Sequence, residues 1–106
     1  MAFFDSSFFA PVPVLWFGYD PDCPGCSTLR PMVDRLEQSL RKQIIVKRVN
    51  AHYEAHKFPT PLLEVPSLLL QVDGNPKLWK LKIEDVQDDK ALLDCLTQGL
   101  DELGWR

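Results

Sequence analysis

Cys23 and Cys26, separated by a proline and a glycine, are the residues of this chain best suited to chemistry. A pair of thiols at this spacing can close a small disulfide ring, or it can supply half of a metal site. Redox use requires one reactive thiol and a second thiol within its reach. Metal binding requires further ligands from elsewhere in the chain. The helices and strands that position the two cysteines therefore help to decide between redox chemistry and metal binding.

The two cysteines lie where a predicted strand gives way to a predicted helix. Residues Val12 to Gly18 form a short apolar, β-branched and aromatic run, which is typical of a buried strand. After Cys26, apolar residues recur every three or four positions and predict a helix with one buried face: Leu29, Met32, Val33, Leu36 and Leu40. Cys23 is then expected at the helix start, where unpaired backbone N–H groups favour the attacking thiolate, with Cys26 as the resolving thiol.

Some residues around the thiols favour redox use, and others oppose it. Pro24 suits the first helical turn, where its missing N–H is no loss. Gly25 leaves little bulk to obstruct an incoming disulfide. Asp20 and Asp22 stand close by in the sequence, and their negative charge opposes thiolate formation.

The rest of the chain predicts three more strands and a second long helix. Residues 44–49 predict a second strand, which the helical crossover places parallel to the first strand. Residues 51–64 contain two prolines and are interpreted as a connector that forms one wall of the site. Strands are predicted at 67–72 and 78–83, the latter near an edge, around the hairpin signal Asp73-Gly74. A helix follows, capped by Asp88 or Asp89 and ended by Gly104, and its buried stripe is predicted to comprise Leu92, Leu93, Leu96, Leu100 and Leu103. This order predicts an α/β fold with a mixed four-stranded sheet, β-α-β-connector-β-β-α, flanked by helices.

These motifs, in this order, resemble the thioredoxin superfamily. The resemblance spans residues 12–104 and rests on Cys-Pro-Gly-Cys after a strand, Pro31 within the following helix, and Val65-Pro66-Ser67 before a leucine-rich strand. It implies a thioredoxin-like fold in which Pro66 is a cis proline beside the dithiol and Val65 offers its backbone to a substrate peptide. The substrate-docking surface would then be lined by Tyr19, Asp22, Pro24, Gly25, Val65 and Pro66.

The sequence departs from this family at positions that matter for proton transfer. Phe17 stands where thioredoxins hold a buried aspartate, and Arg48 stands where they hold its lysine partner. Asp20, Asp22 or water is therefore expected to take the proton of Cys26. The glycine pair that glutaredoxins place after their last strand is missing around residues 83–86, which disfavours dependence on glutathione.

Length and composition limit the alternatives. A chain of 106 residues predicts a single domain, here with a short apolar extension at residues 1–11 whose phenylalanines are expected to pack on it. A net charge of -3 gives no electrostatic reason to bind nucleic acid or an anionic membrane. No basic residue precedes Arg30, so no secretory signal is expected. Three cysteines, one of them (Cys95) expected in the core, fit a reducing compartment, and a cytoplasmic location is predicted.

The sequence thus predicts a monomeric thiol-disulfide oxidoreductase that acts on protein disulfides through Cys23 and Cys26. It would need an electron-donating reductase but no metal and no organic cofactor. Two alternatives stay open. One is a redox-inactive binding or adaptor domain that uses the surface around Val65 and the N-terminal phenylalanines. The other is a zinc-binding structural module, whose ligands would be Cys23, Cys26, His52 and His56.

Overall fold

Four strands form one mixed sheet in the computed structural model, which describes residues 12–105. The sheet order is β2-β1-β3-β4; β1 and β2 are parallel, whereas β3 is antiparallel to β1 and β4. In chain order the elements are β1 (Val14–Tyr19), α1 (Pro24–Ser39), β2 (Ile45–Asn50), the short 3-10 helix η2 (Ala55–Lys57), β3 (Ser67–Gln71), β4 (Leu78–Leu81), the 3-10 helix η3 (Ile83–Asp85) and α2 (Asp89–Glu102). The predicted fold class and element order are confirmed. The phenylalanines of residues 1–11 lie outside the described residues, so their expected packing stays a prediction.

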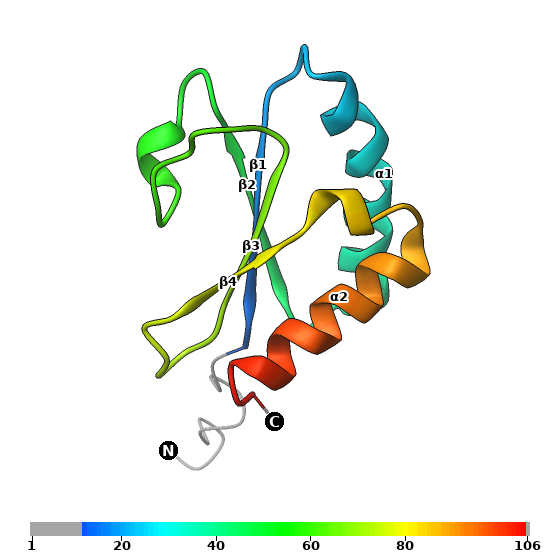
Figure 1. Ribbon diagram of the computed structural model, residues 1–106, viewed down its shortest axis with the longest axis vertical. Coiled ribbons are helices and arrows are strands. Elements are labelled where there is room, and N and C mark those ends of the chain that lie inside the picture. The colour runs from blue at the N-terminus through cyan, green and yellow to red at the C-terminus, as the bar shows by residue number, and fades with distance from the viewer. Residues whose placement is uncertain (1–11, 106) are drawn as a thin grey trace, which may run out of the picture.

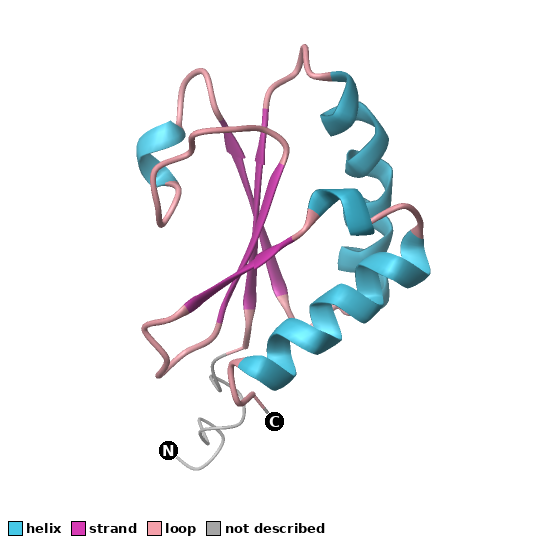
Figure 2. Cartoon of the chain, viewed as in Figure 1, coloured by secondary structure: helices cyan, strands magenta, loops and turns pink. Residues whose placement is uncertain are grey.

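Both long helices cover the same face of the sheet (Figures 1 and 2). Alternation along β1 explains how: Leu15 and Phe17 are buried on the helical side, in one core cluster with Leu29 of α1 and Leu92 of α2. Bidentate pairing of Arg35 with Asp89, at 2.6 and 2.9 Å, ties α1 to the start of α2. These contacts hold α1 and its N-terminal cysteines against β1.

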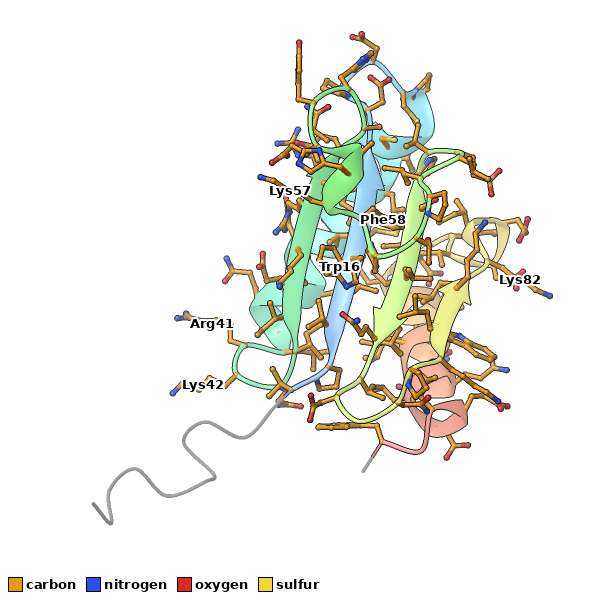
Figure 3. The ribbon with its side chains drawn as sticks, turned by 90° about the vertical axis from the view of Figure 1, so that its left-hand side faces the viewer. Trp16, Arg41, Lys42, Lys57, Phe58 and Lys82 are labelled. Carbon is orange, nitrogen blue, oxygen red and sulfur yellow. The ribbon has the colours of Figure 1, made fainter. Side chains whose placement is uncertain are left out.

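The opposite face of the sheet is covered by the connector between β2 and β3. Trp16 of β1 packs there edge-to-face on Phe58, with ring centroids 6.1 Å apart (Figure 3). The connector approaches β1 so closely that a Cβ on Gly18 would lie 2.7 Å from Cδ1 of Leu62. Glycine at this position therefore lets the connector pack beside the end of β1 that leads to the cysteines. This is the side on which the connector was expected to form a wall of the site.

Several local predictions need correction. β4 ends at Leu81, not at residue 83, because Ile83 starts the 3-10 helix η3. The hairpin signal correctly placed a connection between antiparallel strands, but residues 72–77 form a loop longer than a two-residue turn, with Gly74 at φ 82°. Leu93, expected on the buried stripe of α2, is 43% exposed. Asp88 is the N-cap, since its side chain accepts the N–H of Ala91.

No helix within residues 12–105 has the length and apolarity needed to cross a membrane.

Candidate active site

Cys23 is the N-cap of α1, as predicted. Its backbone is extended, with φ −87° and ψ 119°, Pro24 follows as the first helical residue, and its sulfur accepts the backbone N–H of Cys26 at 3.1 Å. The preceding loop is closed by the N–H of Cys23, which donates to the carbonyl of Asp20 at 3.0 Å. The Cys23 sulfur therefore lies at the positive end of a helix and accepts the N–H of Cys26, an arrangement that favours negative charge on it.

Cys26 lies one turn further along α1 and is buried, with 4% of its surface exposed. Its sulfur accepts the backbone N–H of Asp20 at a long 3.5 Å. Burial, followed by hydrogen bonding to Cys23, raises the pKa of the Cys26 thiol to about 11. Cys23 is half-buried, and all three cysteines are free thiols. The two sulfurs therefore differ. That of Cys23 is partly exposed at the start of α1, whereas that of Cys26 is buried one turn further along, and its raised pKa keeps it protonated at neutral pH.

The raised pKa of Cys26 should make the reduced protein less stable at alkaline pH. The ordinary value is 9.0, so between about pH 9 and 11 the unfolded chain loses this proton while the folded chain keeps it. Because the unfolded state then binds fewer protons, the free energy of unfolding falls across this window, by on the order of 2 kcal/mol. Urea unfolding at both ends of the window measures the fall. Cys26→Ser, which keeps the Lys and Tyr titrations, should lose less stability; an equal loss would contradict the assignment.

Pro66 lies beside the dithiol, and the Val65–Pro66 peptide bond is cis, as predicted. A Cβ placed on Gly25 would lie 3.3 Å from Cδ of Pro66 and 3.9 Å from the sulfur of Cys23. Gly25 and Pro24 are exposed and Val65 is half-buried. Residues from the start of α1 and from the segment before β3 therefore meet at the sulfur of Cys23, although 40 positions separate Gly25 and Val65 in the sequence.

Tyr19 and Asp22, the other two predicted docking residues, differ in exposure and in contacts. Tyr19 is half-buried and packs on Phe17, with ring centroids 5.7 Å apart. Asp22 is exposed, and its backbone N–H donates to Oδ1 of Asp20 at 2.9 Å. Tyr19 and Phe17 also line a cavity of about 40 Å3 beside Cys26, together with Asp20, Pro21, Ser27, Arg30 and Arg48. Only Asp22 of these two is at the open surface.

The alternative zinc ligands are not gathered by the fold. Within residues 12–105, the one group of three potential ligand side chains whose atoms lie within 4.8 Å of one another is Asp20, Asp22 and His52. Neither cysteine nor His56 belongs to it. Nε2 of His52 lies 3.0 Å from Oδ2 of Asp20, so contacts within the protein explain the cluster. His52 is exposed, as expected, but its contact with Asp20 was not predicted from the sequence.

Cys95 lies away from the dithiol, on α2. It is half-buried and packs against the main core cluster, which agrees with the predicted core role. Burial, together with the charges of Asp85 and Asp94, raises the pKa of its thiol. A protonated, partly covered thiol is a poor nucleophile, so Cys95 is not expected to compete with Cys23.

Comparison with known proteins identifies the fold of this chain but not its activity. No protein-family model matches the chain, and no curated protein is similar in sequence. Among solved structures, a fragment of ERdj5 comprising its J and Trx1 parts superposes with a TM-score of 0.71 at 17% identity, over 95% of this chain and 49% of that one. Thioredoxin of Fasciola hepatica superposes with a TM-score of 0.61 at 14% identity, over 83% of this chain and 81% of that one. A structure described as a malarial protein gives a TM-score of 0.66 at 18% identity, over 84% and 98%. The chain therefore has the thioredoxin fold, as its strand-cysteine-helix motif and its Val-Pro-Ser segment predicted.

Proposed function

We propose that this protein is a thiol-disulfide oxidoreductase that exchanges the thiols of Cys23 and Cys26 with disulfides of other proteins. The observation that carries the proposal is the hydrogen bond from the N–H of Cys26 to the sulfur of Cys23 at the start of α1. It supports the proposal because the sulfur of Cys23 accepts a hydrogen bond at the start of α1, and a second, buried sulfur lies one turn further along the helix. The free thiol pair and the neighbouring Pro66 support the same use.

The reaction proceeds by two exchanges. The thiolate of Cys23 attacks one sulfur of the substrate disulfide, forms a mixed disulfide, and the other substrate sulfur leaves as a thiolate. Cys26 then loses its proton and attacks the sulfur of Cys23, which releases the second substrate thiolate. Two electrons have then moved from the dithiol to the substrate, and the two substrate thiolates take up protons from water. The Cys23–Cys26 disulfide must be reduced again by an external reductase before the next turnover.

Substrate proteins would dock around the sulfur of Cys23. The exposed Asp22, Pro24 and Gly25 form one side of this surface, and Val65 and Pro66 form the other. Tyr19, which is half-buried at the end of β1, would border this surface beside the cavity at Cys26. We further propose that the protein acts as a monomer in the cytoplasm, where a reducing environment keeps the dithiol available, and that it needs neither a metal nor an organic cofactor.

A titration in glutathione redox buffers tests this proposal. Alkylation of the remaining thiols, mapped by mass, should show a reversible Cys23–Cys26 disulfide while Cys95 stays free. A midpoint near about −270 mV would mark a reductant, and one near −120 mV an oxidant. Zinc is measured on the same sample, with Cys95→Ser as the control for the third thiol. A dithiol that resists oxidation while stoichiometric zinc stays bound would contradict redox use and favour the structural module.

A binding or adaptor function is the second candidate. It is favoured by two apolar side chains that the connector exposes, Tyr53 at 81% and Leu63 at 89%. Their exposure is typical of a surface that a partner covers. Turnover on a protein disulfide separates the candidates, because an adaptor would bind through this surface without consuming reductant.

A further inference from the structure

The second exchange requires a proton acceptor. The position at which thioredoxins hold a buried aspartate does not supply one in this chain. Phe17 occupies that position, is 1% exposed and belongs to the main core cluster. Cys26 must nevertheless lose a proton before it can attack, and its pKa of about 11 leaves very little thiolate at neutral pH. Arg48 cannot take the proton, since it is a cation paired with Asp34 and Glu37 at 2.6 and 2.9 Å. The acceptor must therefore be another group that faces the Cys26 sulfur.

Asp20 is the carboxylate residue that best meets this requirement for a proton acceptor beside the Cys26 sulfur. Its backbone N–H donates to the sulfur of Cys26 at 3.5 Å, and both residues line the 40 Å3 cavity beside that sulfur. A cavity of this size has room for at least one water molecule, which needs on the order of 15 Å3. The other charged side chains that line it are Arg30 and Arg48, so Asp20 is its one acidic residue. Asp22 is exposed and does not line the cavity.

The carboxylate of Asp20 is held in place by two contacts. Oδ2 lies 3.0 Å from Nε2 of His52, and Oδ1 accepts the N–H of Asp22 at 2.9 Å. A carboxylate has about four acceptor positions, so these contacts leave room for a proton delivered through water. The Asp20 side chain is 24% exposed, which allows the proton to pass on to solvent.

We infer that Asp20 is the proton acceptor for Cys26 in the resolving step, acting through water in the shared cavity. The inference rests on the proposed function. The S–H bond of Cys26 breaks and its proton moves through water to the carboxylate of Asp20. The electron pair left on Cys26 forms the bond to the sulfur of Cys23. The bond between Cys23 and the substrate breaks, and the electron pair of that bond leaves on the substrate sulfur, which departs as a thiolate.

A two-phase assay tests this step separately from the first. A bis(nitrobenzoate) disulfide releases one coloured thiolate when Cys23 attacks it and a second when Cys26 resolves the mixed disulfide. Stopped-flow absorbance follows both phases, and Cys26→Ser identifies the first. Asp20→Asn keeps the backbone N–H and an oxygen that can accept the N–H of Asp22. It should leave the first phase within about twofold of wild type and slow the second about 100-fold at neutral pH.

The pH dependence adds a readout that a structural role would not move. With Asp20 present, the second phase should change little between about pH 6 and 9, because the Asp20 side chain, and not hydroxide, takes the proton of Cys26. In Asp20→Asn it should rise about tenfold per pH unit, since hydroxide must then remove the proton. Asp22→Asn alters the proposed docking surface but not the cavity, so its second phase should keep the rate and pH slope of wild type. Asp73→Asn, in the exposed loop between β3 and β4, is the matched control and should alter neither phase.

Four results would count against the inference. The first is a second phase in Asp20→Asn with the rate and pH slope of wild type. The second is an equal slowing of both phases, which would show that Asp20 only holds the loop. The third is an Asp22→Asn variant as slow as Asp20→Asn. The fourth is the absence of a first phase in the wild type, which would overturn the proposed function itself.

Discussion

Cys23→Ser is expected to reduce turnover on protein disulfides by at least about a thousandfold, because it removes the nucleophile of the first exchange. The variant should fold as the wild type does. Serine is a favourable N-cap, and its hydroxyl oxygen can accept the N–H that the sulfur of Cys23 accepts from Cys26 at 3.1 Å. Insulin reduction measured with dithiothreitol as electron source, beside thermal unfolding of both proteins, separates lost chemistry from lost structure.

Cys26→Ser is the matched variant for this experiment. It keeps the attacking thiol and removes the resolving one, so a mixed disulfide between Cys23 and the substrate should accumulate and be visible by mass. Cys95→Ser should have near wild-type turnover, since Cys95 packs on the core from α2. Full turnover in Cys23→Ser would sink the assignment of the nucleophile. Wild-type protein that binds a disulfide substrate without turnover would favour the adaptor function.

The sequence was sufficient for the features that depend on local patterns. Apolar alternation and three- to four-residue spacing identified the strands and helices, and the Cys23 position followed from the point where one pattern replaces the other. The end of β4 was misplaced because Ile83 continues the apolar alternation, although its backbone has already turned into η3. An alternating pattern reports which side chains are buried and does not report where strand hydrogen bonding stops.

The features that the sequence could not predict are contacts between distant segments. Asp20 and His52 are 32 positions apart, and they meet because β1 and β2 are parallel neighbours: the N–H of Ala51 donates to the carbonyl of Tyr19 at 2.8 Å. The cavity beside Cys26 arises in the same way, from side chains of β1, α1 and β2. No single-sequence pattern encodes such a meeting, so Asp20 could be suspected from its proximity in sequence but not given a partner.

Phe17→Asp is expected to be the most destabilising of the single substitutions considered, although it introduces the residue that thioredoxins carry at this position. Phe17 is 1% exposed, and losing its ring from a packed core costs about 3–5 kcal/mol. A buried carboxylate adds a further cost, because the neighbouring Arg48 is already paired with Asp34 and Glu37. For a domain of this size the midpoint of thermal unfolding should fall by at least about 12 °C. Phe17→Leu, which keeps an apolar side chain, should lose much less.

Phe17→Asn separates the charge from the lost packing, because it has nearly the same shape as Phe17→Asp and cannot ionise. Burial should raise the folded-state pKa of the introduced carboxyl above its unfolded value of about 3.9. The stability of Phe17→Asp should therefore be greatest below that value and should fall as pH rises through the folded-state pKa, whereas Phe17→Asn should not show this fall. Urea unfolding of both variants between about pH 4 and 7 measures the difference. Equal stability at neutral pH would mean that the 40 Å3 cavity beside Cys26 solvates a carboxylate in place of Phe17. In that case a carboxylate at position 17 or at position 20 would be able to accept the proton of Cys26. Asp20 would then have this role because position 17 of this chain holds a phenylalanine.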